Sequence, residues 1–289
     1  SEFTTSFLSQ SSLRQPASVP TSYAATIEAM CASPGDTIGF IPAMGYALAN
    51  QLCGVHPGLA AERYGWNVYW TEFLVARDSE FQTIEDLEGA TWAYPDAGST
   101  SGFLYPSAIF ADAGITIGET VEAGGHPQAV KAVYNGEADV ATAYFSAPLL
   151  PEGNWAMGDF PDIPNEVVAN CAPDETGRLY CGEYRVLDAR AAIVKEAPDV
   201  VQKVRILTIS GEIPNDTMAF SPDFPADMQQ SLKLLLLILH LMLAQKPSVI
   251  RISTTGVALV LSLTKTLMAS ACSWKLRASL SKTLASNNL

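Results

Sequence analysis

Three residues that carry hydroxyl groups stand side by side in this chain: Ser99, Thr100 and Ser101, followed by Gly102. They separate a strand-like run, residues 90–95, from a helix-like run. Starting a helix needs one N-cap side chain, not three. The first N–H groups of a helix have no acceptor inside it, so hydroxyls beside them can hold an anion. The sequence therefore predicts an anion-binding turn, and the alternative is an ordinary capped turn.

Strand-like and helix-like patterns alternate on both sides of this turn. Runs rich in β-branched and aromatic residues predict strands at residues 36–42, 67–79, 90–95, 205–210 and 217–222. Apolar periodicity and caps predict helices at residues 21–30, 43–54, 126–136, 188–204 (in two pieces) and 225–238. Pro106 requires the helix after Ser101 to kink there or to begin its regular part nearby. This alternation predicts an α/β fold with largely parallel sheets.

The composition excludes several classes of function. The 289 residues are 48% hydrophobic, enough for a real core, and carry a net charge of −13, which argues against nucleic acid as a partner. We find no G-x-S-x-G elbow, no Walker motif and no zinc-type spacing among the three histidines and five cysteines. We therefore expect a binding protein with no metal and no cofactor, and not an enzyme.

The two ends of the chain differ from its body. All 30 acidic residues lie at or before Asp227, so the first 227 residues carry −20 and the last 62 carry +7. From about residue 238 to residue 289 no helix-capping residue accompanies a periodic apolar face. A basic extension or a change of reading frame would give such a sequence. Residues 1–20 are rich in serine and threonine and lack the apolar core of a signal peptide.

Four cysteines are spaced so that two short disulfides are possible in an exported protein: Cys31 with Cys53, and Cys171 with Cys181. Buried free thiols are the alternative, and Cys272 is left over in either case.

Several segments, in the same order along the chain, resemble the phosphate/phosphite/phosphonate-binding proteins of ABC importers. The segments are "TSYAATIEAM", "VYWTEFLVARDSEFQTIEDLEG", "YPDAGSTSGFLYPSAIFADAGI", "GGHPQAVKAVYNGEADVAT" and "IPNDT". The resemblance covers roughly residues 19–235, and it departs from the family's pattern at both ends.

The resemblance implies a type II periplasmic-binding-protein fold, in which two α/β lobes are joined by a hinge. Lobe 1 is expected from residues 1–86 and 215–289, with residues 1–20 and about 238–289 atypical. Lobe 2 is expected from residues 87–214, with a surface excursion at residues 147–187.

The same resemblance implies a ligand site in the cleft between the lobes. Besides the three hydroxyls it implies His126, two tyrosines that close from the first lobe, Tyr23 and Tyr69, and a hinge-side acid, Asp216. Relatives that bind aminoalkylphosphonates carry an acid where this chain has Ser146, so an amine-bearing ligand fits poorly.

We therefore expect the solute-binding component of an ABC importer, which binds phosphate, phosphite or a small phosphonate without chemical change. The resemblance implies a membrane permease as partner, a monomeric state, and a periplasmic or extracellular location that could include a lipid anchor. A ligand sensor on the same fold and a non-functional product of a shifted reading frame are the alternatives.

Overall fold

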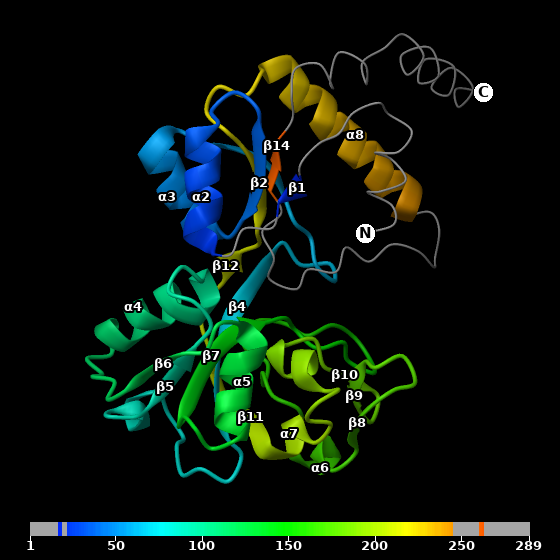
Figure 1. Ribbon diagram of the computed structural model, residues 1–289. Helices are drawn as coiled ribbons and strands as arrows, with labels where there is room; N and C mark the ends of the chain where they lie inside the picture. The colour runs from blue at the N-terminus through cyan, green and yellow to red at the C-terminus, as the bar shows by residue number, and fades with distance from the viewer. Residues whose placement is uncertain (1–16, 19–21, 245–259, 263–289) are drawn as a thin grey trace, which may run out of the picture. The chain divides into compact units, whose positions relative to one another are not determined.

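The computed structural model describes residues 17–18, 22–244 and 260–262, with side chains for residues 22–237. The chain divides into two compact units (Figure 1). Unit 1 contains residues 1–41, 45–61 and 216–289, and unit 2 contains residues 42–44 and 62–215. The expected end segments lie largely outside the described residues, and so do the reading-frame question and Cys272.

Unit 1 is a sheet with helices on both faces (Figure 1). Its strand order is β1-β14-β2-β13-β3, and all pairs are antiparallel. The strands are β1 (Ala17–Ser18), β2 (Thr37–Ile41), β3 (His56–Ala60), β13 (Thr217–Phe220) and β14 (Val260–Ser262). The helices are α2 (Tyr23–Ala32), α3 (Ala43–Cys53) and α8 (Ala226–Ala244).

The alternation of side chains along β2 and β13 creates two cores in unit 1. Ile41 and Ala219 pack with α2 and α3, whereas Ile38 and Phe220 pack toward α8. Ser22 caps α2, because its Oγ accepts a hydrogen bond from the Ala25 N–H at 3.2 Å.

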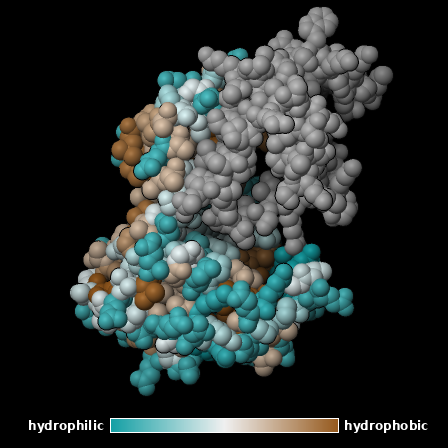
Figure 2. All heavy atoms as spheres, viewed as in Figure 1, coloured by the Kyte–Doolittle hydropathy of each residue, from teal (hydrophilic) through white to brown (hydrophobic). Residues whose placement is uncertain are grey.

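One face of α3 is apolar and exposed. Leu48 and Leu52, four residues apart, are 48% and 65% exposed. Figure 2 shows hydrophobic residues gathered over this helix, whereas much of the visible surface of unit 2 is hydrophilic.

Unit 2 is built on a mixed sheet. The strand order is β11-β4-β7-β5-β6, and β12 pairs with the start of β4. The strands are β4 (Val68–Ala76), β5 (Trp92–Tyr94), β6 (Thr120–Glu122), β7 (Val140–Phe145), β11 (Val204–Ile209) and β12 (Ile213–Pro214). Only the pairs that β5 forms with β6 and β7 are parallel among the strands described. The α/β class is therefore confirmed, but the sheets are less parallel than expected, because β4 and β11 run against their neighbours.

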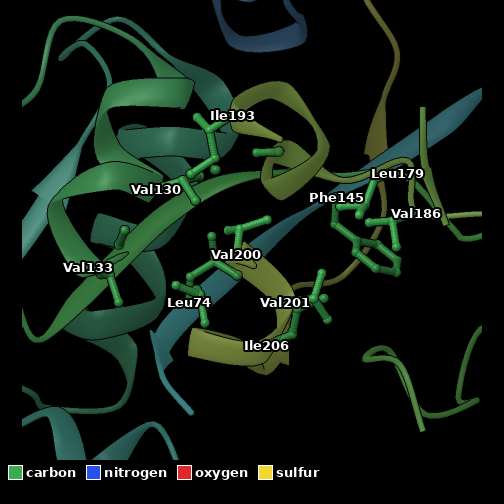
Figure 3. Packing of buried hydrophobic residues seen from close by; sticks show 14 of the residues in the cluster. Leu74, Val130, Val133, Phe145, Leu179, Val186, Ile193, Val200, Val201 and Ile206 are labelled. Carbon is green, nitrogen blue, oxygen red and sulfur yellow. The ribbon is translucent and has the colours of Figure 1, made fainter. Parts of the chain in front are cut away.

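Helical segments cover both faces of this sheet. They are η1 (Glu85–Leu87), η2 (Thr100–Leu104), α4 (Tyr105–Asp112), α5 (His126–Tyr134), α6 (Asn165–Val168), η3 (Ala189–Ile193) and α7 (Val200–Lys203). Leu74 and Phe145 pack with Val130 of α5, Ile193 and Val200 in the larger core (Figure 3). Phe73, Trp92 and Phe110 of α4 form a smaller core.

The segment 147–187, expected as a surface excursion, contributes to the main core of unit 2. Trp155, Ile163 and Leu179 are each at most 3% exposed. The segment also forms a small antiparallel sheet of β8 (Cys171–Pro173), β9 (Leu179–Cys181) and β10 (Tyr184–Arg185). The segment was expected at the surface because it contains many prolines and glycines and because its apolar residues follow no simple period.

The structure bonds the four cysteines in the two expected pairs. Cys31 of α2 joins Cys53 at the end of α3, with an S–S distance of 2.06 Å. Cys171 and Cys181 lie directly opposite each other on β8 and β9 and are also bonded.

The boundary between the units differs from the expected one. Residues 62–86 were expected in lobe 1, but contacts group them with unit 2, because β4 pairs with both β7 and β11. The division into two functional lobes stays a prediction.

Candidate functional site

The hydroxyl-bearing turn follows β5 and opens a helix in unit 2. Ser99 has extended backbone angles, and its Oγ accepts a hydrogen bond from the Gly102 N–H at 3.1 Å, as an N-cap does. Residues 100–104 form one π-helical turn, and the regular helix α4 begins at Tyr105, which places Pro106 in its first turn. The position of Pro106 thus follows the expectation that the regular helix begins near it.

Only glycine fits at position 102. A Cβ atom there would lie 2.1 Å from Cγ of Pro95 and 2.9 Å from Oγ of Ser99. The close approach allows the Gly102 N–H to reach the Ser99 hydroxyl. The N–H groups of Thr100 and Ser101 precede it, at positions that have no acceptor inside a helix.

Two threonines of the central strands hold the carbonyl groups of the turn. Thr71 of β4 donates from Oγ1 to the Ser101 carbonyl oxygen at 2.8 Å. Thr142 of β7 donates to the Gly102 carbonyl oxygen at 2.5 Å. Two carbonyl groups of the turn are thus bound to the sheet, which fixes the position of its Thr100 and Ser101 N–H groups.

The three hydroxyl-bearing residues are each 2% exposed. Oγ1 of Thr100 accepts a hydrogen bond from the Met44 N–H at 3.2 Å, which leaves its own hydrogen available for donation. Buried hydroxyl and amide donors can hold an anion without a cationic side chain, which suits a protein with a net charge of −13.

His126 is the first residue of α5 and lies against the turn. Its Nε2 is 3.4 Å from Oγ of Ser99, and its ring meets the Tyr144 ring edge-on at 5.1 Å. The side chain is 9% exposed, and Nδ1 has no hydrogen-bond partner among the described residues. Burial lowers the pKa of His126 to about 4, so the ring is neutral near pH 7.

A neutral imidazole carries one donor and one acceptor nitrogen. If the Ser99 hydroxyl donates to Nε2, then Nδ1 carries the hydrogen; with the other tautomer, Nδ1 is an acceptor. In either case Nδ1 is a buried polar atom without a hydrogen-bond partner among the described residues, which costs about 1–3 kcal/mol. A ligand oxygen could supply that partner.

The remaining expected residues are distributed over both units. Tyr69 lies on β4 in unit 2, 5% exposed, with the Arg63 guanidinium 5.9 Å from its ring centre. Tyr23 begins α2 in unit 1, and Asp216, also in unit 1, accepts the Ala61 N–H through its carbonyl at 2.9 Å. The structure therefore brings Ser99–Ser101 and His126 together, and the ligand roles of Tyr23, Tyr69 and Asp216 stay predictions.

Sequence reasoning missed three residues of this region: Thr71, Thr142 and Tyr144. The two threonines act through their hydrogen bonds to the turn, and Tyr144 through its contact with His126. Seven residues in a row, from Tyr69 to Val75, are buried in β4, so no alternation of polar and apolar residues marks Thr71 as facing the turn.

The fold of this chain is similar to that of a protein of known structure. The structure is similar to XAC2383 from Xanthomonas citri, solved bound to chloride ion, with a TM-score of 0.52 and 18% identity over 75% of this chain and 67% of that one. A second structure of that protein, bound to ATP, gives a TM-score of 0.52 and 19% identity over 75% and 68%. The chain therefore shares the fold of that protein.

The family model for the periplasmic substrate-binding protein of phosphonate ABC transporters matches residues 7–259. The chain belongs to this family, which confirms a substrate-binding protein rather than an enzyme. The phosphate-import protein PhnD of Mycolicibacterium smegmatis is 28% identical over 194 residues, or 60% of this chain. The match also spans 60% of that relative's length.

Across the part of the chain that the structure describes, no helix combines the length and apolar character needed to cross a bilayer.

Proposed function

We propose that this protein binds a small phosphorus oxyanion and delivers it to the membrane permease of an ABC importer. One observation carries the proposal: three buried hydroxyls and a neutral buried histidine converge on one helix-opening turn of unit 2. Such a turn offers N–H and O–H donors and the positive end of a helix, the usual recognition elements for phosphoryl oxygens.

Phosphate, phosphite and small alkylphosphonates fit the proposal better than an aminoalkylphosphonate. An ammonium group would need a carboxylate beside it, and the position where relatives carry an acid is Ser146 in this chain. PhnD of M. smegmatis is named a phosphate-import protein, which agrees with this choice.

Binding would involve both units. In our proposal Tyr69 contributes from unit 2, and Tyr23 and Asp216 of unit 1 add contacts when a hinge closes the two lobes over the ligand. The closed form docks on the permease in the periplasm as a monomer. A tyrosine hydroxyl donates a hydrogen bond without adding charge, which suits discrimination among small oxyanions.

Thermal unfolding tests the proposal. The protein is melted in phosphate-free buffer and then with phosphate, phosphite, methylphosphonate or sulfate. A ligand present at about 100 times its dissociation constant should add about 2.7 kcal/mol to the free energy of unfolding. A higher melting temperature with a phosphorus oxyanion, and none with sulfate, is expected. A cooperative melt that no phosphorus oxyanion shifts would contradict the proposal and favour a sensor of another ligand.

Replacing the hydroxyls should abolish most of the binding. Thr100→Val together with Ser101→Ala removes two buried donors, each worth about 1.5–3 kcal/mol toward a charged ligand, so affinity should fall by two to four orders of magnitude. Isothermal titration calorimetry measures the change. Ser107→Ala serves as the control, because the Ser107 hydroxyl donates only within the helix, to the Phe103 carbonyl. Equal affinity of the double variant and the control would contradict the anion-binding role.

A further inference from the structure

The side chain of Ser99 has two neighbours that its hydroxyl-bearing companions do not share. Its Oγ accepts a hydrogen bond from the Gly102 N–H at 3.1 Å and lies 3.4 Å from Nε2 of His126. A serine hydroxyl has one hydrogen to donate, and its oxygen can accept two hydrogen bonds. The bond from Gly102 uses only a lone pair, so the hydrogen of Ser99 still needs an acceptor. Within the described part of the chain, only Nε2 of His126 is placed to accept it.

The His126 ring is held in one orientation beside Ser99. It is the first residue of α5, only 9% exposed, and its ring meets the Tyr144 ring edge-on at 5.1 Å and 66°. Burial lowers its pKa to about 4, so near pH 7 the ring carries a single hydrogen, on either Nδ1 or Nε2.

The two tautomers of His126 leave different numbers of buried polar groups unpaired. With the hydrogen on Nδ1, the Ser99 hydroxyl donates to Nε2, and only the Nδ1–H group lacks a partner among the described residues. With the hydrogen on Nε2, that nitrogen donates to Oγ of Ser99. The Ser99 hydrogen then has no acceptor, and Nδ1 has no donor. Because each unpaired buried group is costly, the tautomer with Nδ1–H is favoured.

A bound anion favours the same tautomer. Nδ1 with its hydrogen donates to a phosphoryl oxygen, whereas Nδ1 without a hydrogen turns a lone pair toward the negative charge. The hydrogen bond from Ser99 therefore selects the form of His126 that attracts an oxyanion.

We propose that Ser99 is a positioning residue, whose hydroxyl donates to Nε2 of His126 and so keeps a hydrogen on Nδ1 for the ligand. This inference rests on the proposed function, because the ligand is the phosphorus oxyanion held at the turn. Thr100 and Ser101 donate to that ligand directly, whereas the Ser99 side chain acts on it through His126.

Nitrogen NMR of the full chain, labelled at histidine and free of ligand, measures the tautomer near pH 7. The shift of an imidazole nitrogen differs widely between its protonated and unprotonated forms, and the spectrum of His126→Asn assigns the His126 signals. The wild type should carry the hydrogen on Nδ1. Ser99→Gly should show a new population with the hydrogen on Nε2, because glycine is accepted at an N-cap but has no hydroxyl.

Ser107→Ala is the control for this measurement. Its hydroxyl lies in the next turn of the same helical segment and donates only to the Phe103 carbonyl. The tautomer of His126 in this variant should equal that of the wild type.

A double-mutant cycle then separates the two ways in which Ser99 can act on the ligand. Calorimetry with inorganic phosphate and with methylphosphonate should show that Ser99→Gly alone weakens binding about tenfold, as residues coupled by contact do. His126→Asn places an amide N–H close to the position of Nδ1, and an amide has no tautomers. In that background Ser99→Gly should change the affinity less than about twofold.

The outcomes separate this inference from the proposed function. A wild type that binds phosphate but carries the hydrogen on Nε2 overturns the positioning role and leaves the proposed function intact. An equal loss on Ser99→Gly in both backgrounds does the same, because it shows that the hydroxyl contacts the ligand itself.

If Ser99→Gly does not melt cooperatively, Ser99→Ala replaces it. Failure of both variants to fold would overturn the inference by showing that the side chain of Ser99 serves the fold. A folded wild type that binds no phosphorus oxyanion overturns both the inference and the proposed function.

Discussion

His126 combines two properties at the level of the single residue. Its ring lies beside the Ser99–Ser101 turn, and burial lowers its pKa to about 4. A histidine that titrated near pH 6.5 would make ligand binding depend on pH in the physiological range. The buried His126 stays neutral there, so we expect the ligand contact proposed for it to stay unchanged between about pH 5 and 8.

The same burial makes folding depend on pH. The unfolded chain takes up a proton on His126 near pH 6.5, whereas the folded chain does so only near pH 4, so stability falls as the pH falls between these values. Relative to His126→Gln, the wild type should lose about 2 kcal/mol of unfolding free energy between pH 7 and pH 5. Urea unfolding at the two pH values measures this difference.

Ser107→Ala provides the comparison for this prediction, because the Ser107 hydroxyl bonds only the Phe103 carbonyl and does not titrate in this range. The unfolding free energy of this variant should change between the two pH values as that of the wild type does. Parallel pH profiles of His126→Gln and the wild type would show that His126 does not titrate in this way.

How far the site could be predicted from sequence depends on the range of the interactions. The hydroxyls of Ser99–Ser101 and the position of His126 at the start of α5 are local features of the sequence, so their residue types indicate them directly. Thr71, Thr142 and Tyr144 face the turn only because β4 and β7 pair in one register. Register depends on contacts far apart in the chain, which a single sequence does not display.

At the level of the element, a buried ionic cluster fastens residues 147–187 to the sheet of unit 2. The fully buried Arg190 guanidinium lies 2.7 Å from Oδ1 of Asp162 and 2.9 Å from Oδ2 of Asp188. Asp162 also accepts from Arg77 at 3.0 Å and from the Ile206 N–H of β11 at 3.3 Å. Burial lowers the pKa of Arg190, but the two aspartates outweigh it and raise the pKa above its ordinary value, so the charge persists.

Glu72 lies next to this cluster without a guanidinium partner. Its Oε1 accepts the Ala189 N–H at 3.2 Å, and Oε2 has no hydrogen-bond partner among the described residues. Burial, followed by the charge of Asp188, raises the pKa of Glu72 well above its ordinary value. The raised pKa disfavours ionisation of Glu72 beside the two aspartates, which are paired with the guanidinium groups of Arg77 and Arg190.

Removing Arg190 should destabilise unit 2 strongly. Arg190→Ala leaves the buried carboxylates of Asp162 and Asp188 short of positive charge, which costs about 3–5 kcal/mol. Urea unfolding measures the loss, and Lys195→Ala, at an exposed position nearby in sequence, is the control and should change stability little. A loss below about 1 kcal/mol would mean that the cluster does not hold the segment in place.

The elements themselves were predicted with uneven success. Strands β2, β4, β5, β11 and β13 and the helices α2, α3 and α5 follow the expected ranges, because their patterns are long or well capped. Strand β3, "HPGLA", was missed; it contains both proline and glycine, and it can be a strand because it lies at the edge of its sheet, paired only with β13.

At the level of the whole molecule, unit 2 is almost one continuous stretch of chain. Apart from residues 42–44 it runs from Glu62 to Asn215, and it contains its own core and its own disulfide. Its two ends are joined, since the Asn215 N–H donates to the Asn67 carbonyl at 3.0 Å and Ile213 pairs with Tyr69. These are properties of a segment that can fold alone.

We therefore expect a fragment of residues 62–215 to fold by itself and to melt cooperatively. Circular dichroism and amide hydrogen exchange check this, with slow exchange expected in β4 and β7. A fragment of residues 22–61, which contains β2 without β13 and β14, is the comparison and should show no cooperative melt. A residue 62–215 fragment without a cooperative transition would mean that unit 2 depends on unit 1.

The placement of β2 has a consequence for synthesis of the chain. Both strands that flank β2, β13 and β14, lie after unit 2 in the sequence. At roughly 5–20 residues per second, the ribosome needs roughly 8–30 seconds to make residues 62–215. During this interval β2, with the apolar side chains of Ile38 and Ile41, has emerged but has neither neighbour, while unit 2 can already fold. During synthesis the chain is therefore most vulnerable to aggregation at β2, residues 37–41, and this is the segment that a chaperone would have to shield.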